Sequence, residues 1–113
     1  MHEVTVAEAI VERLKEHLGR RMSGLKAIYL RVGRLTCISA EALQFAFDAM
    51  AADGAVPRTR VEIEWIEPKA ECEDCGADFR PDDRFVMICP HCASPRTRLV
   101  AGDELSLAAA DVE

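Results

Sequence analysis

The stretches Cys72-Glu-Asp-Cys75 and Cys89-Pro-His-Cys92 are two C-x-x-C pairs, with 13 residues between the inner cysteines. Four thiolates at this spacing can converge on the corners of a tetrahedron, the geometry of a closed structural zinc site. Gly76 follows the first pair and gives the backbone the freedom that a tight turn needs, while Pro90 stiffens the second turn. We therefore predict that Zn(II) is bound by Cys72, Cys75, Cys89 and Cys92.

Two other uses of paired cysteines fit this chain less well. A disulfide framework needs an even number of cysteines in an exported protein, whereas this chain has five cysteines and does not begin with an export signal. A thioredoxin-type redox centre uses a single C-x-x-C at the start of a helix inside a strand-helix-strand unit. Zinc binding remains the prediction.

The residues around the cysteine pairs are typical of a zinc ribbon. Pro81-Asp-Asp predicts a turn, residues 85–88 predict a short strand, and residues 99–101 predict the returning strand. A segment this short buries too little apolar surface to fold without a staple. We expect residues 70–101 to form a zinc-binding domain in which the metal replaces a hydrophobic core.

Outside the ribbon, the sequence has the periodicities of strands and helices. Residues 25–32 and 60–67 alternate apolar and polar side chains as half-buried strands do, and a last strand is expected around Leu105. Residues 39–52 predict a helix capped by Ser39. The buried stripe of this helix is expected to consist of Leu43, Phe47 and Met50.

Another helix is expected at residues 5–18. Thr5-Val-Ala-Glu8 matches a capping box, in which each of the two end side chains accepts a hydrogen bond from the other residue's amide, and Gly19 is suited to end the helix. Together the elements predict an α+β fold of two helices packed on a three-stranded sheet, with the zinc-ribbon-like module inserted between two strands. The domain with the helices would comprise residues 1–69 and 102–113.

Charge limits the classes of partner. The chain has 20 acidic and 14 basic residues, a net charge of −6. A surface that binds nucleic acid needs clustered Lys and Arg, and the only basic groupings are pairs such as Arg20-Arg21. No apolar run approaches the length of a membrane span. We expect protein partners in the cytoplasm, with neither nucleic acid nor a membrane bound.

His2 suggests a second metal site. A free α-amine on Met1, the deprotonated amide nitrogen of residue 2 and the imidazole of His2 form two fused chelate rings in one plane, and the amide or carboxylate of Glu3 can add a fourth ligand. Planar nitrogen sets suit Ni(II) or Cu(II) and suit zinc poorly. The alternative is that His2 is a solvated residue near a frayed end.

Several features together resemble one family. They are Met1-His-Glu3, a helix that starts at once, a strand ending in Val32-Gly33, the two cysteine pairs, and Gly102-Asp-Glu-Leu105 near the end. This combination and order are similar to the HypA family of nickel-incorporation accessory proteins for [NiFe]-hydrogenase. The resemblance covers nearly the whole chain.

The resemblance implies a function, a cargo and partners. It implies a metallochaperone that binds Ni(II) through His2, with Met1 and Glu3 contributing, and holds structural zinc with the four paired cysteines. It also implies delivery to the hydrogenase large subunit with the GTPase HypB, and in some members delivery to urease. The resemblance also implies that family members can carry an acidic residue near the nickel site at the start of the second helix, where this chain has Ser39 and Glu41. We expect a monomer or a weak homodimer.

The remaining candidates are few. His91 lies inside the second cysteine pair, where it is either a neighbour of the metal site or a residue that displaces a cysteine from zinc. Cys37 stands alone and is expected to be a small packed side chain. The sequence lacks a phosphate-binding glycine-rich loop, a nucleophile elbow and an H-E-x-x-H motif, so we expect no enzymatic activity. The alternative function is a zinc-ribbon module of a nucleic-acid or transcription complex.

Overall fold

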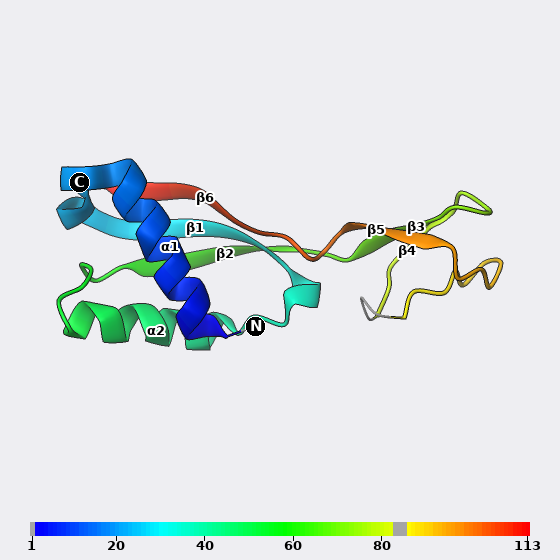
Figure 1. Ribbon diagram of the computed structural model, residues 1–113, viewed down its shortest axis with the longest axis horizontal. Coiled ribbons are helices and arrows are strands. Elements are labelled where there is room, and N and C mark those ends of the chain that lie inside the picture. Colours follow the sequence, from blue (N-terminus) through cyan, green and yellow to red (C-terminus); the bar gives the residue numbers. More distant parts are fainter. Residues whose placement is uncertain (1, 83–85) are drawn as a thin grey trace. The chain divides into compact units, whose positions relative to one another are not determined.

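The computed structural model describes residues 2–82 and 86–113, and its chain forms two compact units. One unit comprises Met1–Arg31, Ile38–Glu64 and Ser106–Glu113, and the other comprises Val32–Cys37 and Trp65–Leu105. Figure 1 labels the helices and strands, which are α1 (Glu3–Leu18), β1 (Leu25–Gly33), α2 (Ala40–Ala52), β2 (Arg60–Ile66), β3 (Lys69–Cys72), β4 (Asp78–Phe79), β5 (Thr97–Ala101) and β6 (Leu105–Val112). Short 3₁₀ helices at Gly19–Gly24 and Arg34–Thr36 flank β1.

The first unit is built on a three-stranded sheet with the order β2-β1-β6, so β1 lies in the centre. The predicted strand at residues 25–32 is confirmed as β1, and those at 60–67 and around Leu105 are confirmed as β2 and β6. Both helices contribute apolar side chains to the core of this unit. The fully buried large side chains of the unit include Leu14, Ile28, Leu30, Leu43 and Phe47.

The first helix begins earlier than predicted. Helix α1 starts at Glu3, with His2 at the N-cap position, and the carbonyl of His2 accepts a hydrogen bond from the amide of Val6 (3.0 Å). The capping box predicted at Thr5 is wrong, because Thr5 already lies within the first helical turn. The predicted end is confirmed, since Gly19 closes α1 in the left-handed region that glycine tolerates (φ +53°).

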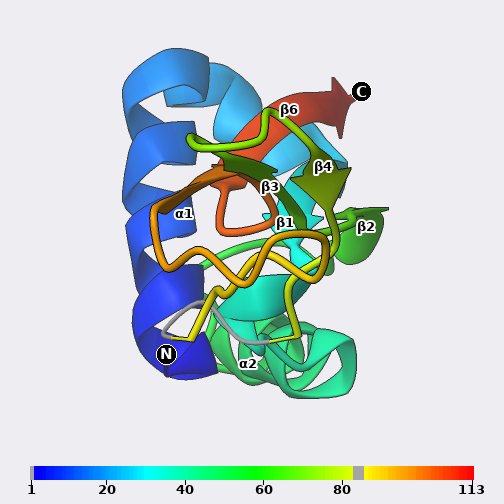
Figure 2. The ribbon, with the colours of Figure 1, turned by 90° about the vertical axis from the view of Figure 1, so that its right-hand side faces the viewer.

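Helix α2 has the start that the sequence predicts. Ser39 is its N-cap residue, and the Ser39 hydroxyl accepts a hydrogen bond from the amide of Ala42 (3.2 Å). Leu43 and Phe47 are buried as expected, but the third buried residue of the helix is Ala46, while Met50 is only half-buried. Figures 1 and 2 show the first turn of α1 beside the start of α2.

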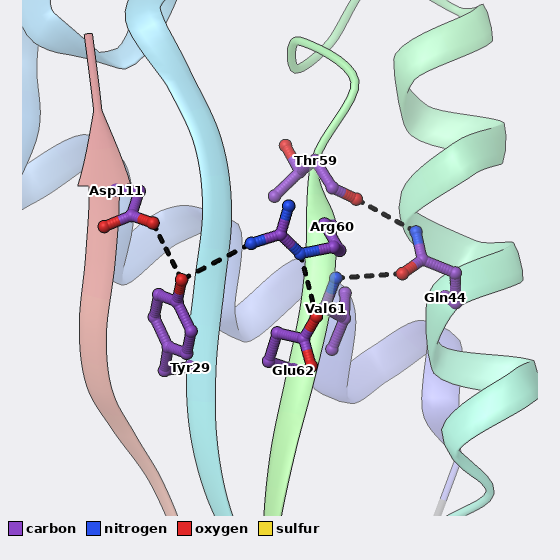
Figure 3. A network of polar contacts seen from close by, with 7 residues as sticks. All are labelled: Tyr29, Gln44, Thr59, Arg60, Val61, Glu62 and Asp111. Carbon is purple, nitrogen blue, oxygen red and sulfur yellow. Dashed lines mark hydrogen bonds and ion pairs between the residues drawn. The ribbon is translucent and has the colours of Figure 1, made fainter.

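The side chain of Gln44 joins α2 to the edge strand β2, as Figure 3 shows. Its Nε2 donates to the carbonyl of Thr59 (2.9 Å), and its Oε1 accepts from the amide of Val61 (2.8 Å). The carboxamide thus pairs with β2 as the peptide group of a neighbouring strand would. Because unpaired edge groups invite pairing with other chains, this contact also protects the outer edge of β2.

The second unit contains a small antiparallel sheet with the order β4-β3-β5. Ala70 of β3 pairs with Phe79 of β4 and with Leu99 of β5. The predicted returning strand is confirmed as part of β5. The strand predicted at residues 85–88 is wrong for residues 86–88, which are not in a strand, and Phe85 lies outside the described residues. Strand β4 takes the place beside β3 that this prediction would have needed.

Close backbone contacts order the same unit. The Gly33 amide donates to the carbonyl of Glu104 (2.7 Å), and a Cβ at Gly33 would overlap the carbonyl of Gly102. The guanidinium of Arg34 lies over the Trp65 ring, 4.9 Å from its centroid, and pairs with Glu67 (3.0 Å).

Among the described residues, no helix is both long and apolar enough to cross a membrane.

Candidate metal sites

The sulfur atoms of the four paired cysteines form a cluster in the second unit. Their Sγ atoms all lie within 4.8 Å of one another. The Sγ atoms of Cys72 and Cys92 are 3.5 Å apart, and those of Cys75 and Cys89 are 3.6 Å apart. Zinc–sulfur bonds of about 2.3 Å place the corners of a tetrahedron about 3.8 Å apart. The cluster therefore has the donor type and spacing of a four-thiolate metal site.

Both halves of the cluster use the same backbone turn. In the first, the amide of Gly76 donates to the carbonyl of Cys72 (3.0 Å), and the amide of Cys72 donates to the carbonyl of Ala77 (2.9 Å). In the second, the amide of Ala93 donates to the carbonyl of Cys89 (2.8 Å), and the Cys89 amide donates to the carbonyl of Ser94 (3.0 Å). The two C-x-x-C pairs are thus equivalent turns that face each other.

Backbone amides also point at sulfur atoms in both turns. The amide of Cys75 lies 3.4 Å from the Sγ of Cys72, and the amide of His91 lies 3.4 Å from the Sγ of Cys89. The first contact holds the pKa of the Cys72 thiol down at about 7, because a nearby donor favours the thiolate. Cys72 and Cys89 are buried, while Cys75 and Cys92 are at the surface.

The contacts among the thiols favour the thiolate of Cys72 and disfavour that of Cys92. The backbone amide of Ser94 favours the thiolate of Cys92, but hydrogen bonds with the neighbouring thiols, Cys72 first among them, raise the pKa of Cys92 to about 12. Four thiolates can coexist this closely when a cation offsets their charge, and metal ligation requires the deprotonated form. The donor set fits Zn(II), which prefers four soft sulfur ligands in a tetrahedron.

Charged side chains hold the two turns together from outside. Asp74, within the first pair, accepts a short hydrogen bond from the Ser94 hydroxyl and pairs with Arg96 (3.2 Å). The guanidinium of Arg96 also lies 3.8 Å from a carboxylate oxygen of Glu73. These surface contacts bring residues 73–74 and 94–96 into one network around the metal ligands.

The other two candidates near the ribbon are not part of the cluster. His91 is exposed, and its backbone amide faces the Sγ of Cys89. Cys37 is also exposed, contrary to the expectation of a packed side chain, and adopts a left-handed conformation (φ 59°). Among the described residues, the only group of three or more His, Cys, Asp or Glu side chains that could hold a metal ion is the four-cysteine cluster.

The amino-terminal candidates lie at the start of α1. His2 is exposed, and Met1 is outside the described residues. The Glu3 side chain is half-buried, and its Oε2 accepts a hydrogen bond from the amide of Ser39 (3.0 Å), 36 residues along the chain. This amide lowers the pKa of Glu3 below its ordinary 4.5, since it favours the charged carboxylate.

The contact between Glu3 and Ser39 could not be foreseen from periodicity or motif. The one available sign was that Ser39 has Ala42 three residues later, in place of the Glu or Gln that would complete a capping box. Such a helix start leaves the N-cap amide without a local acceptor. The structure supplies that acceptor from another helix.

Comparison with known proteins decides the family. The model of a family described as "Hydrogenase/urease nickel incorporation, metallochaperone, hypA" matches residues 1–112. This chain belongs to the HypA family. The HypA match covers both metal sites considered above, and its description is that of a metallochaperone.

HypA relatives match over the full chain. The hydrogenase maturation factor HypA of Methanocaldococcus jannaschii is 36% identical, covering 100% of this chain and 98% of the relative. The protein of the same name from Azotobacter chroococcum is 34% identical, covering 100% of both. The solution structure of the nickel metallochaperone HypA from Helicobacter pylori has a TM-score of 0.65 at 20% identity, covering 99% of this chain and 97% of that one.

Because both HypA structures are only 20% identical to this chain, they support its fold and nothing further. A second one, a solution structure of HypA protein, has a TM-score of 0.68 and covers 100% of this chain. The predicted α+β fold with two helices, a three-stranded sheet and a cysteine-held module is therefore confirmed. The chain is a member of a nickel-incorporation family and carries a four-cysteine metal site.

Proposed function

We propose that this protein binds Ni(II) at its amino terminus and delivers it, with a HypB-type GTPase, into the large subunit of [NiFe]-hydrogenase during maturation. The observation that carries the proposal is the family match over residues 1–112, whose description is nickel incorporation by a metallochaperone. The exposed position of His2 in front of α1 supports it, because cargo must be able to enter and leave.

The nickel ligands in this proposal are the amine of Met1, the amide and imidazole nitrogens of His2, and Glu3. The first amides of an α-helix have no partner within the helix, so the start of α1 leaves the amide of Glu3 without an intrahelical partner. Nitrogen donors in one plane select Ni(II) over Zn(II). Amide and imidazole nitrogens must both be free of their protons to bind, so acid releases the cargo.

The four cysteines have a different role in the proposal. They hold Zn(II) as a permanent structural ion, and the soft tetrahedral sulfur set keeps the two metals apart by chemistry. We therefore divide the chain into a nickel-binding domain at residues 1–69 and 102–113 and a zinc-binding domain at residues 70–101. Urease maturation proteins are second candidate partners. The cytoplasmic location and a monomer or weak homodimer stay predictions.

The test of this function is a nickel titration of the zinc-loaded protein and two histidine variants. His2→Ala removes the imidazole ligand and is expected to abolish stoichiometric Ni(II) binding. His17→Ala is the matched control, because His17 lies in the last turn of α1 at the opposite end of the helix. The control should bind one Ni(II) per chain, and all three proteins should keep their zinc.

Two outcomes would overturn the proposal. One is undiminished nickel binding by His2→Ala. The other is nickel bound at the cysteine cluster, seen as displacement of zinc during the titration.

A further inference from the structure

The start of α2 has half of a capping box. In a complete box, the N-cap side chain accepts from the amide three residues on, and the side chain of that third residue accepts from the N-cap amide. The Ser39 hydroxyl makes the first contact, with the amide of Ala42 (3.2 Å). Ala42 has no side-chain acceptor for the second. The Ser39 amide donates instead to Oε2 of Glu3 (3.0 Å).

The carboxylate of Glu3 is well matched to this position. It belongs to the first turn of α1, so its contact with Ser39 joins the starts of two helices that are far apart in sequence. A negative charge is favoured at a helix N-terminus, where backbone amides point outward. The bond is therefore charge-assisted, and such bonds are the stronger ones in proteins.

We infer that Glu3 is a positioning residue for the nickel site: its carboxylate supplies the missing acceptor at the start of α2, and its backbone amide, rather than its carboxylate, takes part in holding the metal. This inference rests on the proposed function for its nickel part. The adjoining His2 is thereby held beside α2 before any metal arrives. Ordering a site in advance raises affinity, because less conformational freedom is lost on binding.

The first experiment compares nickel binding by Glu3→Gln and Glu3→Ala. Glutamine keeps an oxygen that accepts from the Ser39 amide, so we expect its nickel affinity to fall about threefold or less, against about tenfold for alanine. The absorption spectrum of bound Ni(II) should be the same in both variants and the parent, since the donor set is unchanged. If the carboxylate were a ligand, both variants would lose affinity equally and shift the spectrum, which overturns the inference.

The second experiment changes the other partner. Ser39→Pro removes the amide donor, while the matched control Ser39→Ala keeps it and loses only the hydroxyl contact with Ala42. We expect Ser39→Pro to weaken nickel binding as Glu3→Ala does, with the control close to the parent protein. Circular dichroism checks that α2 persists in both. Equal affinities for the two Ser39 variants would contradict the role of this contact between the Ser39 amide and the Glu3 carboxylate, which we call the tether.

A third measurement needs no nickel and separates this inference from the proposed function. In the metal-free protein, hydrogen exchange of the Ser39 amide should be slow in the parent and in Glu3→Gln, and faster in Glu3→Ala. Slow exchange in all three would overturn the tether, whatever the nickel titration gives. Slow exchange in the first two with no nickel bound by the parent would uphold the tether and reject the nickel site.

Discussion

At the scale of residues, the two cysteine turns carry a glycine and an alanine at one equivalent position with the same backbone conformation. Gly76 (φ +75°) and Ala93 (φ +62°) each follow the second cysteine of a pair, and both adopt the left-handed conformation. Glycine takes this conformation freely, whereas a side chain there costs about 1–2 kcal/mol. Ala93 therefore makes the second turn the more strained of the two.

Placing alanine at position 76 and glycine at position 93 should have different effects on the free energy of unfolding. Gly76→Ala should lower the free energy of unfolding by about 1–2 kcal/mol. A Cβ at Gly76 meets no atom within 4 Å, so the cost is in the backbone alone. Ala93→Gly should be neutral or slightly stabilising, because relief of strain offsets the greater freedom of the unfolded chain. Thermal unfolding of the zinc-loaded proteins measures both, and equal losses would refute the equivalence of the turns.

Residues whose role depends on a local pattern could be predicted from the sequence. The four paired cysteines converge as their spacing indicates, and Ser39 caps α2 as its position before an apolar period suggests. The bond between Glu3 and Ser39 could not be predicted, because it depends on how two helices pack. The capping box predicted at Thr5 is wrong, because α1 already begins at Glu3.

At the scale of elements, the contact of Gln44 with β2 is a second link that no sequence pattern indicates. Gln44→Leu keeps the apolar part of the side chain but leaves the Thr59 carbonyl and the Val61 amide unpaired (Figure 3). The expected cost is about 1–3 kcal/mol of unfolding free energy, the usual price of an unsatisfied polar group. Chemical denaturation measures this loss.

A substitution at Asp48 controls for the exposed contact that the half-buried Gln44 also makes. The Gln44 Nε2 also donates to Asp48 (3.0 Å) at the exposed face of α2, and Asp48→Asn keeps an oxygen acceptor there. Its effect should stay within about 0.5 kcal/mol, as is usual for surface substitutions. If Gln44→Leu were as mild as this control, the pairing with β2 would not contribute to stability.

Elements with a strong period were predictable, and those set by pairing were not. Strands β1 and β2 and both helices follow the apolar periods of the sequence. In the ribbon, residues 86–88 are apolar enough for a strand, yet Val86 and Ile88 are 65% and 55% exposed. Strand β3 already has β4 and β5 on its two edges, so pairing rather than hydrophobicity decides which residues form strands there.

At the scale of the whole molecule, the two compact units depend on different forces. The unit with α1 and α2 has an apolar core, whereas the unit with β3, β4 and β5 is organised around the cysteine cluster. Removing zinc with a chelator should therefore unfold the ribbon while helix content largely survives, because metal binding and folding are coupled in such small modules. Far-ultraviolet circular dichroism and amide spectra measure this, and simultaneous loss of both helices would contradict it.

The central claim is that the cargo ion is held by the amino terminus and the structural ion by the cysteines. Its most direct test is metal analysis of the protein and of a form with the residues Gly-Ser-Gly-Ser added before Met1, which move His2 too far from the free amine to share a chelate with it, both exposed to excess Ni(II) and then desalted. The account predicts one nickel per chain in the unextended protein, none in the extended form, and one zinc in each. Equal nickel content in the two forms would contradict it.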